Sequence, residues 1–565
     1  MAKKKDEPVV VDDRAEQLEV LIKAGQKKYG VGSIAYAKDL KHGHLHRITT
    51  GIIGLDISLG GGLPVGRASM FYGPKSCLSS DAFIRYEVRT KDGQRQNHKG
   101  GTIERLYSRF NGIPIEGKES YQRDVSVDSE FFVSSVNEDG QTFMNRIVGV
   151  VDAGEQECFE LKASTGETIT ATAKHRFFTG SSYVRLGDLS VGDAVTVQRK
   201  TKPDGLGHSL KVEVVSIKSV GVRHTYDIQM QAPYNNFVAD DFIVHNSSKT
   251  TNFLRAAGRG QRMCSNCWTP AFPIWTPDYT ETEPNCACGA YRKSMIAWID
   301  VEGVWEENWS KKFLRIDSDS LLLSRPETGE HACDIAEGLL RSGAVDIIAI
   351  DSIAMMTPME EIEKSASESS MATQARLLGK HFRKITMGLN SLANREGRKP
   401  SVWFINQVRT DVGVMFGNPE VTPGGRAQGF TMSTETRMSA GKYIRDKESG
   451  QPTSVVMKYR NEKNKTWVAK MEGEYSVCLC DTEVKKLGQV IDEPYALKLG
   501  SQLGLVDVGR GRASYNGVDY AGRSLLERHW MLHPDEYEDY KAALMALIIE
   551  RGGVMYANSE EELSG

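Results

Sequence analysis

The stretch ASMFYGPKS, residues 68–76, predicts a buried strand that leads into the first half of a phosphate-binding loop. The second half, SSKTT at residues 247–251, follows only after a separate segment of 170 residues. Joined end to end, the halves give GPKSSSKT, whose backbone N–H groups would wrap phosphates while Lys249 pairs with the outer ones and Thr250 holds Mg²⁺. The sequence therefore predicts a strand–loop–helix unit cut within its loop, and an insert at residues 77–246.

Two further residues bear on this loop. Asp351 ends the apolar run IIAID at residues 347–351, where a carboxylate can complete the Mg²⁺ shell. Ser248 stands where such loops usually have glycine, and a positive φ there would cost serine on the order of 1 kcal/mol. The residues predicted to contact nucleotide are Gly73, Pro74, Lys75, Ser76, Ser247, Ser248, Lys249, Thr250, Thr251 and Asp351.

Composition places limits on the chain. Its 565 residues predict two to four domains, and 40% hydrophobic with 26% charged content fits a soluble globular protein. The net charge of −3 gives no sign of nucleic-acid binding, so any DNA contact must use a local patch or loop. We expect no membrane partner and a cytoplasmic location, because the sequence lacks both an apolar run of about 18 residues and a signal peptide.

The pattern of apolar and β-branched residues changes at the edges of the insert. Within 77–246, short β-branched runs at 143–151, 167–173, 194–199, 212–217 and 225–230 are separated by turns, which predicts an all-β unit. Beyond it, apolar runs at 295–299, 346–350 and 401–405 alternate with amphipathic helical stretches. That alternation predicts an α/β core with a parallel sheet and flanking helices.

The edge residues of the insert are those that protein self-splicing needs. Cys77 begins it and can take over the preceding acyl group as a thiolate nucleophile. Ser247, just after it, supplies a second nucleophile. Asn246 can cyclise through its side-chain amide to release the insert, and His245 is an adjacent acid or base.

Inside the insert, TATAKH at 170–175 places Thr172 and His175 where they can hold the first peptide bond and protonate its nitrogen. With LGDLSVGDAV (186–195), TYDIQM (225–230) and NNFVADDFIVHN (235–246), the insert resembles an intein of the Hedgehog/intein (HINT) fold, of the mini-intein kind. The resemblance makes Asp227 the carboxylate that tunes Cys77. Asn235 departs from the histidine of many inteins, which puts more of the last step on His245. An inactive intein is the alternative.

Cys158 lies on a predicted strand of the insert. A buried small apolar residue is one interpretation. The other is a redox partner of Cys77 that switches splicing off.

The rest of the chain resembles the RecA recombinase family. The matching motifs are RITTGIIGLDISLGGGLPVGR (47–67), the split loop, WIDVEG (298–303), RPETGEHACDIAEGLLRSGAVDIIAIDSIAMMTP (325–358), FINQVR (404–409) and GVMFGNPEVTPGG (413–425). The resemblance implies a RecA-like P-loop ATPase core, ATP and Mg²⁺ as cofactors, and homo-oligomeric filaments that act on single- and double-stranded DNA.

Particular roles follow from the same motifs. Glu302 would polarise the attacking water, Gln407 would sense the γ-phosphate, and Trp309 would stack on adenine. Two loops, at 359–371 and 408–426, would meet DNA through Arg376, Arg409, Phe416 and Asn418. Lys463 and Lys465 match a pair that reaches a neighbour's ATP, whereas Gly429 replaces the family's lysine before Phe430.

Four cysteines form a cluster that the family resemblance does not account for. Cys264-x2-Cys267 and Cys286-x-Cys288 lie 18 residues apart, a spacing that suits tetrahedral Zn²⁺ in a small zinc ribbon. Four unconnected cysteines in a loop are the alternative. Cys478 and Cys480 form another Cys-x-Cys, which we attribute to alternation along a strand.

Together these features predict a precursor that excises residues 77–246, joins Ser76 to Ser247 and becomes a RecA-like ATP-dependent DNA recombinase. A RadA- or helicase-like DNA-repair ATPase and a non-hydrolysing DNA-binding filament protein stay open as alternatives. The predicted segments are an N-terminal tail and oligomerisation helix (1–46), the first part of the core (47–76), the insert (77–246), the loop helix (247–261), the zinc-ribbon-like insertion (262–292), the core with DNA-binding loops (293–486), a small α+β C-terminal domain (487–550) and an acidic tail (551–565).

Overall fold

The structure is a computed structural model that describes most of the chain. The described residues are 14–29, 33–36, 45–74, 77–90, 95–111, 129–136, 141–180, 183–200, 207–230, 236–245, 249–271, 286, 288–303, 305, 310–311, 315–363, 371–395, 400–410, 420–445, 452–478, 481–486 and 488–551.

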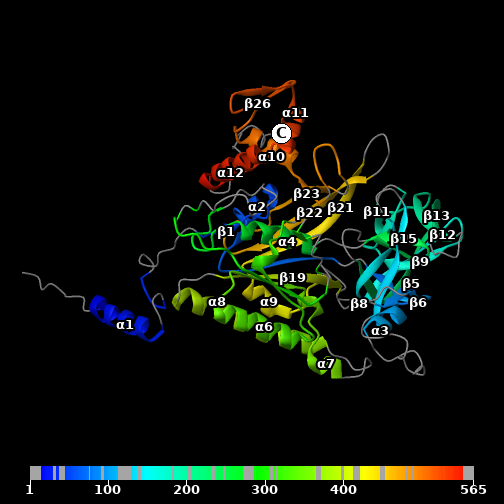
Figure 1. The fold of residues 1–565 in the computed structure, drawn as a ribbon, viewed down its shortest axis with the longest axis horizontal. Helices are drawn as coiled ribbons and strands as arrows, with labels where there is room; N and C mark the ends of the chain where they lie inside the picture. Colours follow the sequence, from blue (N-terminus) through cyan, green and yellow to red (C-terminus); the bar gives the residue numbers. More distant parts are fainter. Residues whose placement is uncertain are drawn as a thin grey trace, which may run out of the picture.

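A mixed β-sheet forms the core outside the insert (Figure 1). Its strands are paired in the order β17-β16-β18-β19-β3-β21-β22-β23-β24. Their bounds are β3 Ala68–Pro74, β16 Ile296–Asp300, β17 Leu321–Ser324, β18 Ile347–Asp351, β19 Ser401–Thr410, β21 Thr434–Arg445, β22 Pro452–Asn464, β23 Glu472–Cys478 and β24 Val490–Ile491. The six strands from β17 to β21 are parallel, as predicted, but β22, β23 and β24 continue the sheet antiparallel, which the sequence analysis did not anticipate.

Helices cover both faces of this sheet. Alternate residues of each strand point to opposite faces, so Trp403 and Ile405 join one apolar cluster and Val402 and Phe404 the other. The first cluster lies between the sheet and α4. The second lies between the sheet and helices α6 and α8, which are below the sheet in Figure 1. The helices of this core are α2 Ile53–Leu59, α4 Lys249–Gln261, α6 Gly329–Ser342, α7 Met359–Glu363, α8 Met371–Arg395 and α9 Gly425–Thr431, with the 3₁₀ turns η3 Ser318–Ser320 and η4 Ile353–Met355.

The two sides of the cut loop meet in this core. Strand β3 lies between β19 and β21. Its pairing with β19 continues to its last residue, Pro74, which is aligned with Val408. The ring of Phe71, on β3, stacks on Phe253 of α4 with 4.1 Å between centroids and 8° between planes. Strand and helix are therefore docked on each other although the insert separates them in the sequence.

Smaller elements surround the core. The C-terminal part, orange to red at the top of Figure 1, packs its helices against a short antiparallel sheet. Helix α1 lies apart from the core (Figure 1), and Gln26 near its end donates a hydrogen bond to the carbonyl oxygen of Ile34 at 2.9 Å. These elements are α1 Arg14–Tyr29, β1 Arg47–Ile48, β2 Leu63–Pro64, β20 Glu420–Val421, α10 Glu493–Gln502, β25 Asp507–Gly509, β26 Arg512–Tyr515, β27 Val518–Tyr520, α11 Arg523–Leu532 and α12 Pro534–Glu550.

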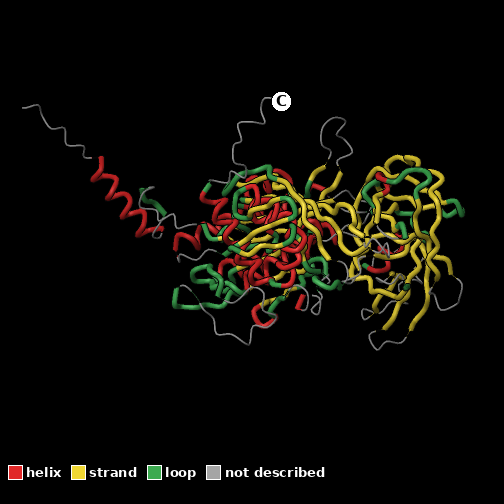
Figure 2. The backbone as a smooth tube through the Cα atoms, turned by 90° about the horizontal axis from the view of Figure 1, so that it is seen from above, coloured by secondary structure: helices red, strands yellow, loops and turns green. Residues whose placement is uncertain are grey.

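The insert is a separate body of strands, seen beside the core in Figure 2. Two long strands, β8 and β13, pair along most of their length and bend at register shifts. The strands of the insert are β4 Leu78–Ser79, β5 Phe83–Thr90, β6 Arg95–Thr102, β7 Ser129–Val136, β8 Thr142–Ala163, β9 Thr168–Thr172, β10 Arg176–Phe178, β11 Tyr183–Arg185, β12 Ala194–Lys200, β13 Gly207–Met230, β14 Asn236–Ala239 and β15 Phe242–His245, with the 3₁₀ turn η2 Leu186–Asp188.

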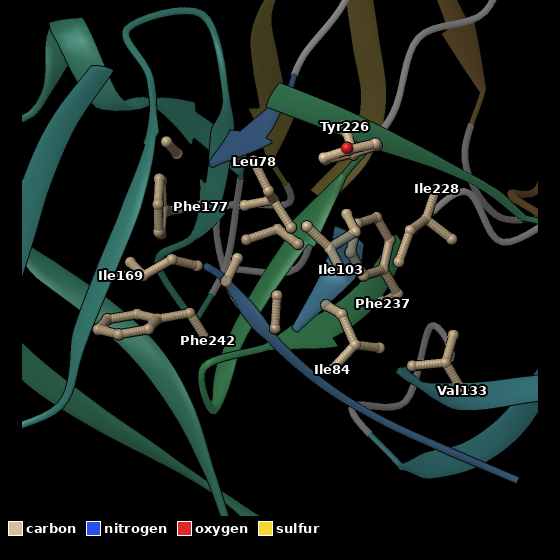
Figure 3. Packing of buried hydrophobic residues seen from close by; sticks show 14 of the residues in the cluster. Leu78, Ile84, Ile103, Val133, Ile169, Phe177, Tyr226, Ile228, Phe237 and Phe242 are labelled. Carbon is tan, nitrogen blue, oxygen red and sulfur yellow. The ribbon is translucent and has the colours of Figure 1, made fainter. Parts of the chain in front are cut away.

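One helix departs from the all-β expectation for the insert. Helix α3, Ile103–Phe110, begins at Thr102, whose side chain accepts a hydrogen bond from the backbone of Arg105. Its buried residues, Ile103 and Leu106, belong to the apolar core that strands of the insert enclose (Figure 3). The helix therefore closes one side of a core that is otherwise built from strands.

The C-terminal part holds the loop helix α4 through a buried ion pair. Arg259 of α4 lies 2.8 Å from Glu538 of α12, and the side chains are 17% and 18% exposed. Glu538 also accepts a hydrogen bond from Lys541, at 2.7 Å. Although burial opposes ionisation, Arg259 and Lys541 hold the pKa of Glu538 well below its usual range.

Replacing Glu538 by Gln should leave Arg259 as a buried cation without its partner charge. We expect Glu538→Gln to lower the free energy of unfolding by about 3 kcal/mol in urea titrations. The matched control is Asp481→Asn, which removes the exposed pair with Lys486 and should change stability by less than about 0.5 kcal/mol. Equal effects of the two substitutions would contradict the importance of the buried pair.

Candidate functional site

The first residue of the insert is held by Thr172. The backbone N–H of Thr172 donates to the carbonyl oxygen of Cys77 at 3.1 Å, and the Thr172 hydroxyl lies 3.3 Å from the same oxygen. The hydroxyl also lies 3.4 Å from the backbone nitrogen of Cys77, which is the nitrogen of the peptide bond that joins the insert to the preceding residue. Thr172 thus touches this junction at both its nitrogen and the neighbouring carbonyl, and all of these atoms are buried.

Sheet register brings two more predicted residues to the same place. Leu78 pairs with Tyr226 and Ser79 with Thr225, so continuing the antiparallel register places Asp227 across from Cys77. The backbone N–H of His175 donates to the carbonyl of Thr172 at 2.9 Å, in the turn that follows β9. Asp227 and His175 are both buried. Cys77, Thr172 and Asp227 therefore lie on or beside neighbouring strands, with His175 in the turn that follows β9.

The far end of the insert returns to this turn. Strand β15 pairs with β10, and its last residue, His245, is aligned with Arg176, the neighbour of His175. The other edge of β15 pairs with β14, where His245 is aligned with Asn236. The segment 172–176 is therefore the place where the start and the end of the insert meet.

Asn236 is a residue that sequence reasoning missed. Its buried side-chain amide accepts hydrogen bonds from the Ser135 hydroxyl at 2.9 Å and the Val136 backbone at 2.8 Å, and donates to the Val136 carbonyl at 2.9 Å. These bonds tie β14 to β7 and hence support β15. The signal was available, because an amide inside an apolar strand such as NFVA needs buried partners.

The sheet argues against a disulfide between Cys77 and Cys158. Cys158 pairs with Thr172 on one edge of β9, while Cys77 contacts Thr172 on the other. Two strand spacings, roughly 9–10 Å, exceed the Cα separation of about 7 Å that a disulfide tolerates. Burial raises the pKa of the Cys158 thiol to about 12, so it stays protonated near neutral pH. Cys158 is therefore better described as a buried core residue.

In the core, Glu302 and Gln407 lie in contact. The amide nitrogen of Gln407 donates to Glu302 Oε1 at 2.7 Å, and the hydroxyl of Ser352 donates to the same oxygen. Gly73, the first residue of the cut loop, is aligned with Gln407 between β3 and β19. Ser352, which sequence reasoning did not name, follows the fully buried Asp351 at the end of β18. Glu302, Gln407 and Asp351 thus gather at the end of β3 where phosphates would bind.

The predicted DNA-contacting residues are placed in part. Arg376 is exposed on α8 and lies 3.8 Å from Glu360 of α7, which occupies the start of the first predicted loop. After the second predicted loop, the Nζ atoms of Lys463 and Lys465 donate hydrogen bonds to the carbonyl oxygens of Gly429 and Phe430, near the end of α9. The two lysines therefore hold the helix that follows the predicted loop.

Other predicted residues lie outside the described part of the chain. These are Lys75, Ser76, Asn235, Asn246, Ser247, Ser248, Trp309, Phe416, Asn418 and Cys480. For Pro74, His245, Lys249, Thr250 and Arg409 the structure describes the backbone only, and Thr251 lies half-buried in α4.

The four clustered cysteines converge. Cys267 and Cys286 have their sulfur atoms 3.2 Å apart, Cys286 and Cys288 3.1 Å, and Cys264 and Cys288 3.8 Å. All four sulfur atoms lie within 4.8 Å of one another. Cys264 comes shortly after α4 and bridges to Lys293, which precedes β16. The four sulfur atoms are therefore close enough together to contact one ion.

Among the described residues, no helix has the length and apolar content needed to cross a membrane.

Comparison with known proteins agrees with the geometry of the core. Residues 285–480 match the family described as the RecA N-terminal domain. Protein RecA of Cytophaga hutchinsonii is 33% identical over 289 residues, which are 50% of this chain and 76% of that protein. Protein RecA of Ruminococcus albus is 36% identical over 264 residues, covering 46% of this chain and 62% of that protein. A mixed sheet with helices on both faces and Glu302 and Asp351 at its strand ends makes the core an α/β domain, and its sequence matches that of the RecA N-terminal domain. The chain belongs to the RecA family.

Solved structures share features with a further part of the chain. A crystal structure of an Ssp DnaB mini-intein variant is 26% identical, covers 31% of this chain and 96% of its own, and has a TM-score of 0.23. A DnaB intein from Synechocystis is 27% identical, with coverages of 31% and 99% and a TM-score of 0.22.

Asp240, in the turn between β14 and β15, has a raised pKa. Asp240 accepts a hydrogen bond from the Phe83 backbone at 2.9 Å, yet burial, reinforced by Asp81 and Asp241, raises its pKa to about 7. The folded state therefore binds this proton more tightly than the unfolded state, so the contribution to stability is present near pH 4 and is lost as pH rises to about 7. Asparagine does not ionise, so we expect the free energy of unfolding of Asp240→Asn to fall by about 2 kcal/mol less between pH 4 and pH 7.

The measurement is urea unfolding of both proteins between pH 4 and 8, plotted as the difference between them. A difference that stays constant across this range would show that the pKa of Asp240 is the same in the folded and unfolded states.

Proposed function

We propose that this chain is a self-splicing precursor of a RecA-like DNA recombinase. The observation that carries the proposal is the meeting of Cys77 and the His245 end of the insert at residues 172–176, inside a break in a phosphate-binding loop. Any domain inserted within a loop needs ends that lie close together, but an insert with another purpose needs no nucleophile at its first residue. The mini-intein interpretation rests on this geometry together with the edge residues.

The first step is an acyl shift at the bond between Ser76 and Cys77. The Cys77 thiolate attacks the carbonyl carbon of Ser76, the C–N bond breaks, a thioester forms, and the Cys77 nitrogen gains a proton. The Thr172 hydroxyl, 3.4 Å from that nitrogen, can hold the bond, and His175 can supply the proton. Asp227, placed across from Cys77 by the strand register, can accept the thiol proton.

The remaining steps exchange the acyl group and release the insert. The Ser247 hydroxyl attacks the thioester, which frees the Cys77 thiol and leaves an ester on Ser247. The side-chain amide of Asn246 then attacks its own carbonyl, so that the bond to Ser247 breaks and a succinimide ends the insert. His245 can protonate the departing nitrogen, and that amine displaces the ester oxygen to form the Ser76–Ser247 peptide bond. No oxidant or reductant is needed.

Once joined, the core supports ATP hydrolysis coupled to DNA binding. Residues 73–76 and 247–251 would form the phosphate loop, and Thr250 with Asp351 would hold Mg²⁺, which neutralises charge on the phosphates. Glu302 can orient water toward the γ-phosphate. Gln407, bonded to Glu302 at 2.7 Å and lying on the strand that enters the second predicted DNA loop, can transmit the state of the nucleotide to that loop.

We infer that the family's filament on single-stranded DNA and its pairing with double-stranded DNA apply to the spliced chain. Arg376, Arg409, Phe416 and Asn418 are the proposed DNA contacts. The RadA- or helicase-like alternative would lack strand exchange, and the filament protein without hydrolysis would lack DNA-stimulated ATPase activity, so both assays on the joined protein distinguish the three.

A blocked precursor should show that splicing controls the ATPase. With Cys77→Ala and Asn246→Ala together, the loop stays cut, and we expect DNA-stimulated phosphate release at least about 100-fold below that of the spliced protein. Intact mass should show a single chain of 565 residues for the variant, and products of 395 and 170 residues for the natural sequence.

Matched single substitutions sharpen this experiment. Cys77→Ala alone should still allow cleavage after Asn246, whereas Asn246→Ala alone should allow thiol-induced cleavage before Cys77. Full ATPase activity of the double variant would sink the coupling, and an unprocessed natural chain would sink the splicing proposal.

We also propose that the cysteine cluster binds Zn²⁺ in the reducing cytoplasm. Four sulfur atoms within 4.8 Å suit the tetrahedral, thiolate-only coordination of structural zinc. Cys264, Cys267, Cys286 and Cys288 would then fasten the end of α4 to the chain that enters β16. Zinc would stabilise the link between the phosphate-loop helix and the strand that leads to Glu302.

Metal analysis tests this proposal. We expect one zinc per chain, and its loss in Cys286→Ser/Cys288→Ser with a thermal midpoint lower by roughly 5 °C or more. Cys478→Ser, at a buried cysteine outside the cluster, serves as the control and should keep its zinc. A metal content near zero in the natural protein, purified without chelator, would contradict the proposal.

A further inference from the structure

Two histidines and a glutamate meet where α11 gives way to α12, in the C-terminal part of the chain at the top of Figure 1. His529 lies in the last turn of α11, His533 is the residue between the two helices, and Glu536 lies in the first turn of α12. One ring nitrogen of each histidine and one carboxylate oxygen of Glu536 all lie within 4.8 Å of one another. We call these three residues the α11–α12 cluster. Neither the splicing chemistry nor the nucleotide site of the core uses it.

The backbone brings the three side chains together. The N–H of His533 donates to the carbonyl oxygen of His529 at 2.9 Å, which keeps the two histidines one helical turn apart. Pro534 then begins α12, and His533 leaves the helical range with φ of −122° and ψ of 74°, so the chain turns a corner. This corner returns Glu536 to His529, where Oε2 and Nε2 lie 2.9 Å apart.

The imidazole rings are held in a defined arrangement. The ring of His533 stacks on that of His529 with 4.1 Å between centroids and 26° between planes, and the ring of Tyr520 lies 5.2 Å from that of His529. Nδ1 of His533 lies 2.8 Å from the carbonyl oxygen of His529. A carbonyl oxygen only accepts hydrogen bonds, so Nδ1 is the donor, and in the neutral ring Nε2 keeps its lone pair. Histidines that bind metals commonly donate their second nitrogen to a backbone carbonyl in this way.

The ligand set and its exposure favour a transition-metal ion. Two imidazoles and one carboxylate are the donors of zinc sites that keep a fourth position open, whereas Ca²⁺ and Mg²⁺ select oxygen ligands. Tetrahedral Zn²⁺ needs donor atoms about 3.3 Å apart, so ligand atoms within 4.8 Å need only a small movement of exposed side chains. His529 and Glu536 are 25% and 52% exposed, and His533 is also exposed, so an ion has access from solvent.

We propose that the α11–α12 cluster binds Zn²⁺ through His529, His533 and Glu536, with water at the fourth position. An ion pair between His529 and Glu536 alone is the simpler explanation, but such a pair has no use for a second imidazole in the tautomer that a metal needs. This site is distinct from the cysteine cluster, whose ligands are sulfur atoms beside the core, and it does not depend on splicing.

The proposed site lies close to the contact between the C-terminal part and the core. Glu538, the partner of Arg259 on α4, follows Glu536 by two residues on the same helix. Between them, Tyr537 donates a hydrogen bond from its hydroxyl to Asp492 at 2.9 Å. Zinc that fixes the first turn of α12 would therefore also hold the residues that fasten this part of the chain to the phosphate-loop helix.

Zinc binding is tested on the full chain blocked by Cys77→Ala and Asn246→Ala, so that the sample stays a single species. The protein and its variants are dialysed against Zn²⁺ at fixed free concentrations, and bound zinc is counted by metal analysis. We expect the parent to bind one zinc per chain more than His533→Ala at free Zn²⁺ up to about 100 µM. This difference has the same value whether or not the cysteine cluster is also occupied.

Matched variants separate a metal site from a structural role. Glu536→Gln keeps a hydrogen-bonding group opposite His529 but removes the carboxylate, and it should weaken zinc binding at this site at least about tenfold. Its control is Asp535→Asn, which removes the same charge from the same turn of α12, outside the cluster. His331→Ala, at an exposed histidine on α6, is the control for His533→Ala. Both controls should bind as much zinc as the parent.

Three outcomes would overturn the proposal. The first is equal zinc content in the parent and in His533→Ala over the whole concentration range, which would leave an ion pair only. A loss of zinc in Asp535→Asn as large as in Glu536→Gln is the second, because it would show general attraction by negative charge. The third is displacement of this zinc by an equal concentration of Mg²⁺, which imidazole ligands do not allow.

Discussion

The stacking of Phe71 on Phe253 is the contact on which the core depends. It joins the strand before the cut to the helix after it, and it continues to Trp403 in the middle of the sheet, whose ring lies 5.4 Å from that of Phe253. Because β3 lies between β19 and β21, this contact docks α4 on the centre of the sheet. The buried Arg259–Glu538 pair then fixes the far end of the same helix. The core is therefore assembled around an interruption that affects a few loop residues and leaves the packed layers intact.

The junction chemistry depends equally on strand register. Cys77, Thr172 and Asp227 come from three neighbouring strands or their ends, and β15 brings the other end of the insert to the same turn. Strands hold side chains more firmly than loops do, and a shift by one residue would move every one of these groups to the other face. Asn236 supports this register, because its side chain ties β14 to β7.

Much of this arrangement follows from the sequence, and the exceptions have physical causes. Apolar runs predicted β16, β18 and β19 because strands buried on both faces need continuous hydrophobic residues. The runs at 212–217 and 225–230 instead form one strand, β13, because residues between them pair with β8 across register shifts, where alternation fails as a signal. Ser352 escaped notice because a hydroxyl gains its role only when Glu302, 50 residues away, meets it. The capped start of α3 at Thr102 was readable but is short enough to be masked by surrounding strand patterns.

The closeness of the two ends of the insert has a consequence for the order of folding. While the insert is unfolded, docking α4 on β3 must close a loop of 170 residues. Once its ends are held side by side at residues 172–176, the same closure costs no more than that of a loop of a handful of residues, a difference of about 3 kcal/mol in chain entropy. Folding of the insert thus lowers the entropy cost of assembling the core. A defect that slows folding of the insert would therefore delay formation of the core.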